Sequence, residues 1–204
     1  MRALALIGTG LFLAAASPPL AITDLKPIAL HPGVNRVPGF LVGGGTATIV
    51  EAWRGNGNAH GYHVWMVLGG PSEGNPVGLV TAEGDTIGDN PFDGERVLGA
   101  VRFATGRIDG KPATLLIKAS LDEAPSGVLA DHSTATVTWY RLDHATDEMD
   151  MIGRTIDEFI SIGTVHTTGR YCNADLAMRD VAHVPLPSDF DGFNGTDGCF
   201  PIRK

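Results

Sequence analysis

The length, composition and charge of the chain favour one acidic folded domain and exclude several classes of protein. Its 204 residues are 43% hydrophobic and only 19% charged, which is enough apolar material for a core and excludes general disorder. The formal net charge of −8 provides no electrostatic footprint for nucleic acid or for an anionic membrane surface. With 27 glycines and 13 prolines, the chain favours many short strands joined by turns over long helices.

The first residues have the features of a signal peptide. Arg2 supplies a positive start, residues 3–16 are almost wholly apolar, and Ala14–Ala16 forms a small-residue cleavage site. The apolar run is shorter than the roughly 20 residues that a membrane-spanning helix needs, so a signal peptide is favoured over an anchor. We therefore expect a cleaved signal peptide over residues 1–16 and a single β-rich domain over 17–204. The mature protein would be periplasmic or secreted, without a transmembrane segment.

Strand signals follow along most of the remaining chain. Residues 17–45 are rich in proline and glycine and predict an extended lead-in with at most one or two short strands. Asp109-Gly110 predicts a type I′ hairpin turn, because both residues tolerate positive φ and both flanks are rich in apolar residues. Runs of β-branched and aromatic residues predict strands at 46–53, 62–68, 77–81, 97–108, 111–120, 134–142 and 159–166. With helical signals limited to a turn or two at 147–154, the pattern predicts an all-β fold, a single mainly antiparallel sandwich or barrel-like domain with long loops.

Cys172 and Cys199 are the two cysteines of the chain and lie near its C-terminal end. In an oxidising compartment an even pair of this kind predicts a disulfide bond. A bridge that closes a loop of this length contributes about 3–4 kcal/mol in the chain-entropy treatment. The alternative is a pair of free or metal-binding thiols, and no further soft ligand stands at a spacing typical of zinc sites. We therefore expect a disulfide.

The sequence lacks the signatures of several common catalytic sites. It contains no Gly-x-Ser-x-Gly, no Ser-x-x-Lys, no His-Glu-x-x-His and no P-loop, so we expect neither an acyl-enzyme serine nor a bound cofactor. The segment Asp189–Asp197 is similar to a calcium loop but lacks several of its ligands, which leaves an irregular calcium site as an alternative to a polar loop. Trp53, Trp65 and Trp139 lie in predicted strands, where core packing is favoured over a platform for a sugar.

The segment 56–63 joins two predicted strands and is the most distinctive polar segment of the chain. One interpretation is an ordered loop that satisfies its own backbone, because Asn and Gly favour tight turns. A second is a patch for a ligand or partner, since amide, imidazole and phenol groups donate and accept hydrogen bonds. The members of this patch would be Asn56, Asn58, His60 and Tyr62. The third, a metal site, is the weakest, because two histidines three residues apart take opposite faces of a strand.

The sequence around this loop resembles a known family. The stretch Ala52–Val64 is similar to the periplasmic carbapenem self-resistance proteins of the CarG-like type, which carry an Arg-x-Asn-x-Asn-Ala-His-small-aromatic sequence entering a strand. Leu30–Asn35 looks like the Gly-Val-Asn lead-in of the same proteins, and Cys172–Leu176 is loosely similar to a short element near their C-terminus. His63 stands where the family leads us to expect an acidic residue. The resemblance implies an exported β-rich protein that protects cells from a carbapenem without hydrolysing it.

The motifs and the resemblance lead to one functional expectation and two alternatives. We expect an exported non-catalytic protein that confers intrinsic tolerance to carbapenem-type β-lactams by binding rather than hydrolysis. The bound partner would be a β-lactam, a cell-wall component or a second periplasmic protein. The alternatives are a β-sandwich module for a carbohydrate or cell-wall fragment, and a metal-dependent hydrolase with His60 among its ligands.

Overall fold

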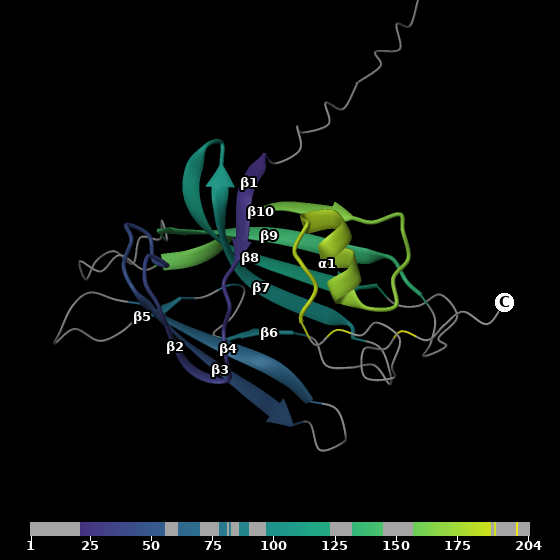
Figure 1. The fold of residues 1–204 in the computed structure, drawn as a ribbon, viewed down its shortest axis with the longest axis horizontal. Coiled ribbons are helices and arrows are strands. Elements are labelled where there is room, and N and C mark those ends of the chain that lie inside the picture. Colours follow the sequence, from purple (N-terminus) through teal and green to yellow (C-terminus); the bar gives the residue numbers. More distant parts are fainter. Residues whose placement is uncertain are drawn as a thin grey trace, which may run out of the picture.

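In the part of the chain that the structure describes, two antiparallel sheets and one helix form the architecture (Figure 1). The structure, a computed structural model, describes residues 21–55, 61–69, 78–80, 82, 86–89, 97–122, 132–144, 157–188, 190 and 199. In spatial order, the first sheet contains β1 (Ile22–Pro27), β7 (Gly99–Ile108), β8 (Lys111–Leu121), β9 (Ala135–His144) and β10 (Asp157–His166). The second sheet contains β2 (Gly33–Val37), β3 (Ala47–Gly55), β4 (Gly61–Gly69) and β5 (Gly78–Val80), while β6 (Ile87–Gly88) pairs with β4. The sheets are not closed into a barrel, so the predicted all-β fold is confirmed as a sandwich.

The hairpin between β7 and β8 forms where the sequence predicts it. Asp109 has φ 49° and Gly110 has φ 77°. Positive φ at both central residues is what a type I′ turn requires, and it matches the twist of the flanking strands. The register follows from this turn, since Ile108 pairs with Lys111 and the ladder continues to Gly99 opposite Ser120.

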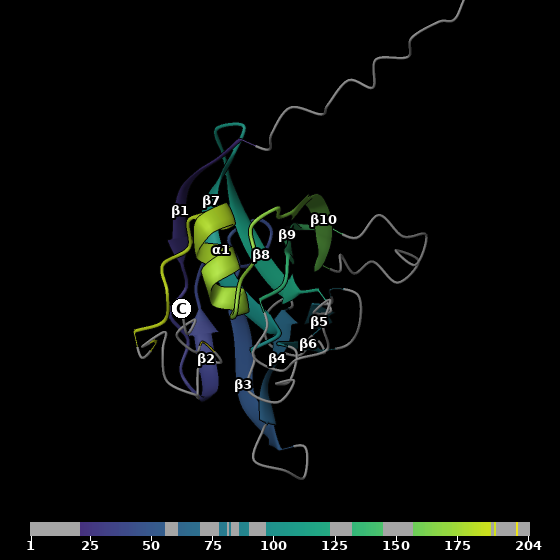
Figure 2. The same cartoon turned by 90° about the vertical axis from the view of Figure 1, so that its right-hand side faces the viewer.

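Alternation along β7 divides the interior into two layers. Val101 and Phe103 face the second sheet, whereas Ala100 and Ala104 face the helix α1 (Ala174–Ala182) on the other side of the first sheet (Figure 2). The layer between the sheets is aromatic at its centre, and the layer under the helix is mostly small and aliphatic. The buried members of the first layer are Phe40, Ala47, Ile49, Trp65, Val67, Val80, Ala82, Ile87, Val101, Phe103, Leu116, Tyr140, Leu142 and Phe159.

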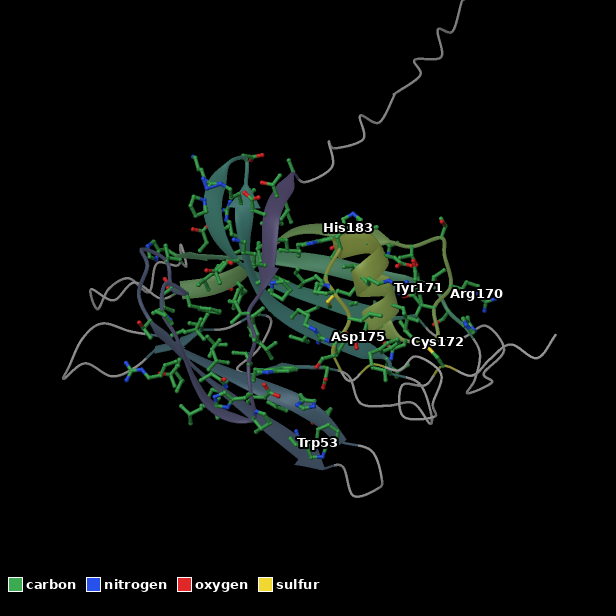
Figure 3. The ribbon with its side chains drawn as sticks, viewed as in Figure 1. Trp53, Arg170, Tyr171, Cys172, Asp175 and His183 are labelled. Carbon is green, nitrogen blue, oxygen red and sulfur yellow. A yellow bond between two sulfur atoms is a disulfide. The ribbon has the colours of Figure 1, made fainter. Side chains whose placement is uncertain are left out.

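The helix α1 is an element that the sequence interpretation did not include. The Asn173 side chain caps its N-terminus by accepting a hydrogen bond from the backbone N–H of Asp175 at 2.7 Å. His183 ends the helix in the left-handed conformation, with φ 56°. Directly before the cap, Cys172 forms a disulfide with Cys199, so the predicted pairing of the two cysteines is confirmed (Figure 3).

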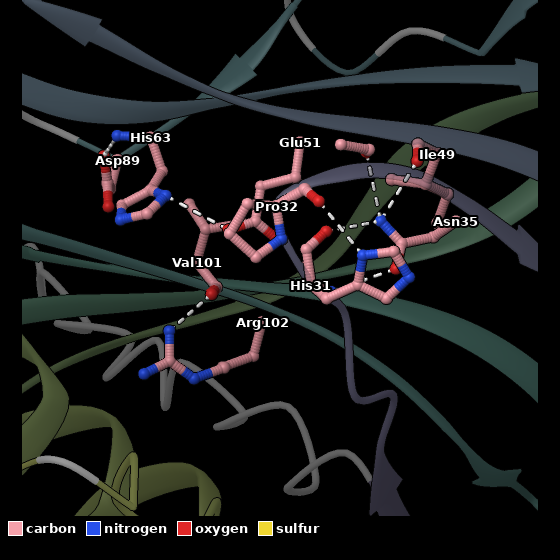
Figure 4. A network of polar contacts seen from close by, with 10 residues as sticks. His31, Pro32, Asn35, Ile49, Glu51, His63, Asp89, Val101 and Arg102 are labelled. Carbon is pink, nitrogen blue, oxygen red and sulfur yellow. Dashed lines mark hydrogen bonds and ion pairs between the residues drawn. The ribbon is translucent and has the colours of Figure 1, made fainter.

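The proline- and glycine-rich lead-in contributes one edge strand to each sheet. β1 lies at the edge of the first sheet and β2 at the edge of the second, so this part of the chain crosses between the layers. The buried amide of Asn35 holds the crossing: it donates to His31 O at 2.8 Å and to Ile49 O at 3.3 Å, and accepts from His31 N at 3.0 Å (Figure 4). The Gly-Val-Asn motif therefore has a structural role here, because its Asn hydrogen-bonds backbone groups of the crossing and of β3.

Several predictions concern residues outside the described part of the chain. They are the signal peptide at 1–16, the loop residues Asn56, Asn58 and His60, the short helical turn at 147–154, and nearly all of the calcium-like segment from Asp189 to Asp197. Among the described residues, no helix combines the length and apolar character needed to cross a membrane.

Candidate functional site

At one end of the sandwich β3 and β4 run past the first sheet (Figure 1). A cleft of about 680 Å³ opens at this end. Its walls come from the ends of β3 and β4, the crossing segment 27–30, the first half of β7, Asn173 and Asp175 at the start of the helix, and residues 185–188 and 190. β1 pairs with one edge of β7 from Ala104 to Ile108, and Val101–Phe103 border the cleft, while β8 pairs along the other edge of β7. The volume lies within the range of small-molecule sites.

Three rings from the second sheet form the aromatic wall of the cleft. Trp53 is the cross-strand partner of His63, and Trp65 follows two residues later on the same face of β4. The Trp53 and His63 ring centroids are 4.9 Å apart edge to face, and those of His63 and Trp65 are 5.7 Å apart and nearly parallel. Trp65 is buried, whereas Trp53 is 57% exposed at the end of β3 (Figure 3). The wall therefore leads from the core to solvent.

Gly61 determines how the outermost ring lies. A Cβ atom at position 61 would stand 2.4 Å from Cε2 of Trp53 and 2.6 Å from the backbone oxygen of Arg54. Both distances are shorter than any ordinary carbon contact, so a side chain here would displace the indole or the strand. The glycine thus allows Trp53 to lie over the first residue of β4.

Two carboxylates lie beside this wall. Glu51 Oε1 is 3.1 Å from His63 Nδ1, an ion pair when the imidazole is protonated, and Asp89 Oδ1 accepts a hydrogen bond from the His63 backbone N–H at 2.7 Å (Figure 4). Burial raises the pKa of Asp89 from 3.8 to about 6, against the hydrogen bond from His63 and the nearby charges of His63 and Arg102, which lower it. Asp89 is therefore a carboxylate whose charge is only partly compensated by its surroundings.

The facing wall is tied together by Arg102. Its guanidinium forms a salt bridge with Asp175 at 2.6 Å and donates a second hydrogen bond to Val101 O at 2.7 Å. Asp175 lies in the first turn of α1, where a negative charge interacts favourably with the helix dipole. The pair links the edge of β7 to the helix, and it occupies Arg102 with partners inside the protein.

Two ring nitrogens in the wall have no hydrogen-bond partner among the described residues: Trp65 Nε1 and His63 Nδ1. His63 Nδ1 is close to Glu51, but the contact lacks hydrogen-bond geometry. Buried polar groups without partners are costly, and they occur most often where a site serves a function. In the described part of the chain, no three His, Cys, Asp or Glu side chains are grouped so as to hold a metal ion.

The sequence-predicted site and the cleft meet at β4. Asn56, Asn58 and His60 lie outside the described residues, in the connection between the ends of β3 and β4 that form the mouth of the cleft. Tyr62 is among the residues that border the cleft, but alternation places its side chain on the outer face of the second sheet. There the Arg54 guanidinium lies 5.6 Å from the centre of its ring.

The sequence interpretation missed most of the charged residues of the cleft. Glu51 carried a usable signal, because it interrupts the apolar face that Ile49 and the two strand tryptophans share. A carboxylate on that face needs a partner or a function. Asp89 and Arg102 carried no such signal, since they reach the cleft only through the pairing of β6 with β4 and the approach of α1 to β7.

Comparison with known proteins supports the fold. No protein-family model matches the chain, and no curated protein matches it. Among solved structures, the crystal structure of CarG is similar with a TM-score of 0.59 and 22% sequence identity, over 76% of this chain and 95% of that one. At this level of identity the likeness shows that the two proteins share a fold.

Proposed function

We propose that this protein is an exported, non-catalytic binding protein that confers tolerance to carbapenem-type β-lactams, and that it binds its ligand in the cleft between β3, β4 and β7. The cleft is the observation that carries the proposal, because it combines a volume suited to a small molecule with an exposed indole and fixed charges. The resemblance of Ala52–Val64 to carbapenem self-resistance proteins supports it, since these residues include Trp53 and His63 of the aromatic wall. The fold shared with CarG supports the same direction.

Two features support export. The chain begins with a segment that has the composition of a signal peptide. The disulfide between Cys172 and Cys199 is a bond that forms and persists in oxidising compartments such as the periplasm. A protein in that compartment meets β-lactams where they act, on the assembly of the cell wall.

To test the proposal, the full chain is expressed and exported in a carbapenem-susceptible bacterium. The minimum inhibitory concentration of the carbapenem is measured together with the amount of intact drug in the medium. We expect higher tolerance with the drug left intact, and a return to the susceptible level for Trp53→Ala. Met66→Ala is the matched control, because Met66 is also partly exposed but lies on the opposite face of the second sheet. Loss of intact drug from the medium would show hydrolysis and contradict a non-catalytic role. Full tolerance with a folded Trp53→Ala variant would show that the binding site does not lie in the cleft.

A second candidate function rests on the exposure of Trp53. An indole that is 57% exposed beside carboxylates is also a surface on which a sugar ring stacks, as in a module for a carbohydrate or cell-wall fragment. Cosedimentation of the purified protein with insoluble peptidoglycan distinguishes the two functions. Cosedimentation that depends on Trp53, without any change in drug tolerance, would favour this module.

A further inference from the structure

Among the described side chains of the cleft, the charges do not balance. Its described ionisable side chains are three carboxylates, one guanidinium and one imidazole: Glu51, Asp89, Asp175, Arg102 and His63. Arg102 and Asp175 neutralise each other at 2.6 Å, and Arg102 donates in addition to Val101 O. The remaining carboxylates, Glu51 and Asp89, contact His63, and the charge of Arg102 also lowers the pKa of Asp89, but the described carboxylates of the cleft outnumber its described cationic groups whether or not the imidazole is protonated.

Both of these carboxylates retain capacity to accept hydrogen bonds. An ionised carboxylate offers about four acceptor positions on its two oxygens. Among the described residues, the Asp89 carboxylate accepts one hydrogen bond, from His63 N, and the Glu51 carboxylate has one polar contact, between Oε1 and His63 Nδ1. Burial raises the pKa of Asp89, which shows that its surroundings stabilise the ionised carboxylate less well than water does. A positively charged group in the cleft would stabilise the ionised forms of both carboxylates.

The aromatic wall favours the same class of group. A cation within about 6 Å of an indole or other aromatic face is attracted by the ring quadrupole, and tryptophan is the best of these partners. Trp53 is 57% exposed and stands next to His63, which contacts Glu51 through its ring and Asp89 through its backbone. An exposed indole attracts organic cations, and carboxylates beside it add charge of the complementary sign.

From this arrangement we infer that the cleft recognises its ligand through an ammonium or amidinium group, held by Glu51 and Asp89 against the wall formed by Trp53 and His63. The inference rests on the proposed role of the cleft as the binding site, and it names the chemistry of the ligand. A carboxylate on the same ligand is directed to solvent, because the charged residues of the cleft repel it. Two sources supply such a cation: a carbapenem with a basic side chain, and a cell-wall peptide with a free amine.

The first experiment separates charge from shape. Benzylammonium, benzyl alcohol and benzoate present the same ring with a positive, a neutral and a negative group. Each is titrated into the mature protein, and the indole N–H signal of Trp53 is followed by NMR after assignment with Trp53→Phe. We expect benzylammonium to bind at least about fivefold more tightly than benzyl alcohol, and benzoate to bind most weakly.

Isosteric amides then test the two carboxylates. Glu51→Gln and Asp89→Asn should each weaken benzylammonium binding about fivefold and leave the binding of benzyl alcohol unchanged, since they remove charge and little volume. Asp24→Asn is the control, because Asp24 is an exposed carboxylate on β1 outside the lining of the cleft. The NMR spectrum of each variant reports whether it has folded.

The outcomes distinguish the inference from the proposed function. Benzoate binding as tightly as benzylammonium would overturn the inference about charge and leave the cleft as the binding site. If none of the three probes shifts the Trp53 signal, both the inference and the proposed binding site fail.

A second series of compounds identifies the source of the cation: a carbapenem with an amidine side chain, the same carbapenem nucleus without a basic group, and a cell-wall tripeptide with a free amine. If either basic compound binds more tightly than the nucleus without a basic group, the inference is supported and that compound is the source. If the nucleus without a basic group binds as tightly as the basic compounds, the inference is overturned.

Discussion

The layer between the two sheets has a closed end and an open end, and both are built from aromatic rings. At the closed end, Phe40, Phe103 and Phe159 pack with centroid distances of 6.0–6.1 Å and exposures of 1–3%. At the open end, the rings continue from Phe103 to Trp65 at 6.2 Å, and then through the wall of the cleft to Trp53, which is 57% exposed. The two ends thus share their chemistry and differ in what covers them.

The difference follows from where the pairing of β1 with β7 stops. Phe103 lies near the middle of β7, between the half that pairs with β1 and the half that borders the cleft. Beyond Phe103, β7 still pairs with β8 but its other edge borders the cleft, and the second sheet carries Glu51 and His63 on the face that is apolar at the closed end. Rings covered on both sides stabilise the fold, and rings covered on one side, with charges beside them, form a surface for a ligand.

Breaking the closed end should have the largest effect on stability. Phe40 is 1% exposed and contacts the rings of Phe103 and Phe159. Phe40→Ala removes these contacts and leaves a cavity, so the free energy of unfolding should fall by about 3–5 kcal/mol. Urea denaturation followed by circular dichroism measures the change.

The matched variant at the open end is Trp53→Ala, which should lower the free energy of unfolding by about 1 kcal/mol or less, because the indole is mostly in water already. Equal losses for the two variants would show that the open end is part of the core and that its exposure has no functional meaning.

The charge at the open end should have an intermediate effect that depends on pH. Asp89 has a pKa of about 6 in the folded protein and 3.8 when unperturbed, so the folded state holds this proton more tightly than the unfolded chain. Stability is therefore lost as the pH rises from about 4 to about 6, and the loss is complete above pH 6. Asp89→Asn does not titrate and keeps an oxygen that accepts from His63 N.

The free energy of unfolding of Asp89→Asn, relative to the wild type, should accordingly rise by up to about 3 kcal/mol between pH 4 and pH 7. Urea denaturation at a series of pH values measures the difference, in which the contributions of other groups cancel. A difference that is flat with pH would mean that Asp89 is well solvated. A stabilised variant that binds cations less well would show directly that the site is maintained at a cost in stability.

The predictable parts of the fold are those decided by neighbouring residues. Asp109-Gly110 specified a hairpin because the turn needs positive φ at two adjacent positions, and the strands around it were recognisable from their composition. The helix α1 was missed, because it is nine residues long and depends on the Asn173 cap and on burial of Ala174, Ala177 and Met178 against the first sheet. Packing of that kind is a property of the assembled domain.

The site shows the same division. The stretch around Trp53 and His63 was distinctive in sequence, and the structure places both side chains in the cleft, although the predicted site residues did not include His63. Arg102 and Asp175 are 73 positions apart and meet through the docking of α1 against β7. Their pairing depends on the three-dimensional arrangement of the layers, and a single sequence does not encode it in any local pattern.

The last comparison concerns two glycines at the open end that differ in what a single added carbon atom would contact. Gly55 and Gly61 face each other across β3 and β4, but a Cβ at Gly61 would stand 2.4 Å from the Trp53 ring, whereas one at Gly55 meets nothing within 4 Å. Gly61→Ala should therefore lower the free energy of unfolding by about 1–2 kcal/mol and displace the indole, while Gly55→Ala should be neutral or slightly stabilising. Urea denaturation and the NMR signal of the Trp53 indole test the pair together.

If Gly61→Ala leaves both the stability and the indole signal unchanged, Trp53 does not lie over the start of β4 and does not form the outer part of the cleft wall. Loss of benzylammonium binding in Gly61→Ala but not in Gly55→Ala would instead show that the position of this one ring, and not its presence alone, determines recognition.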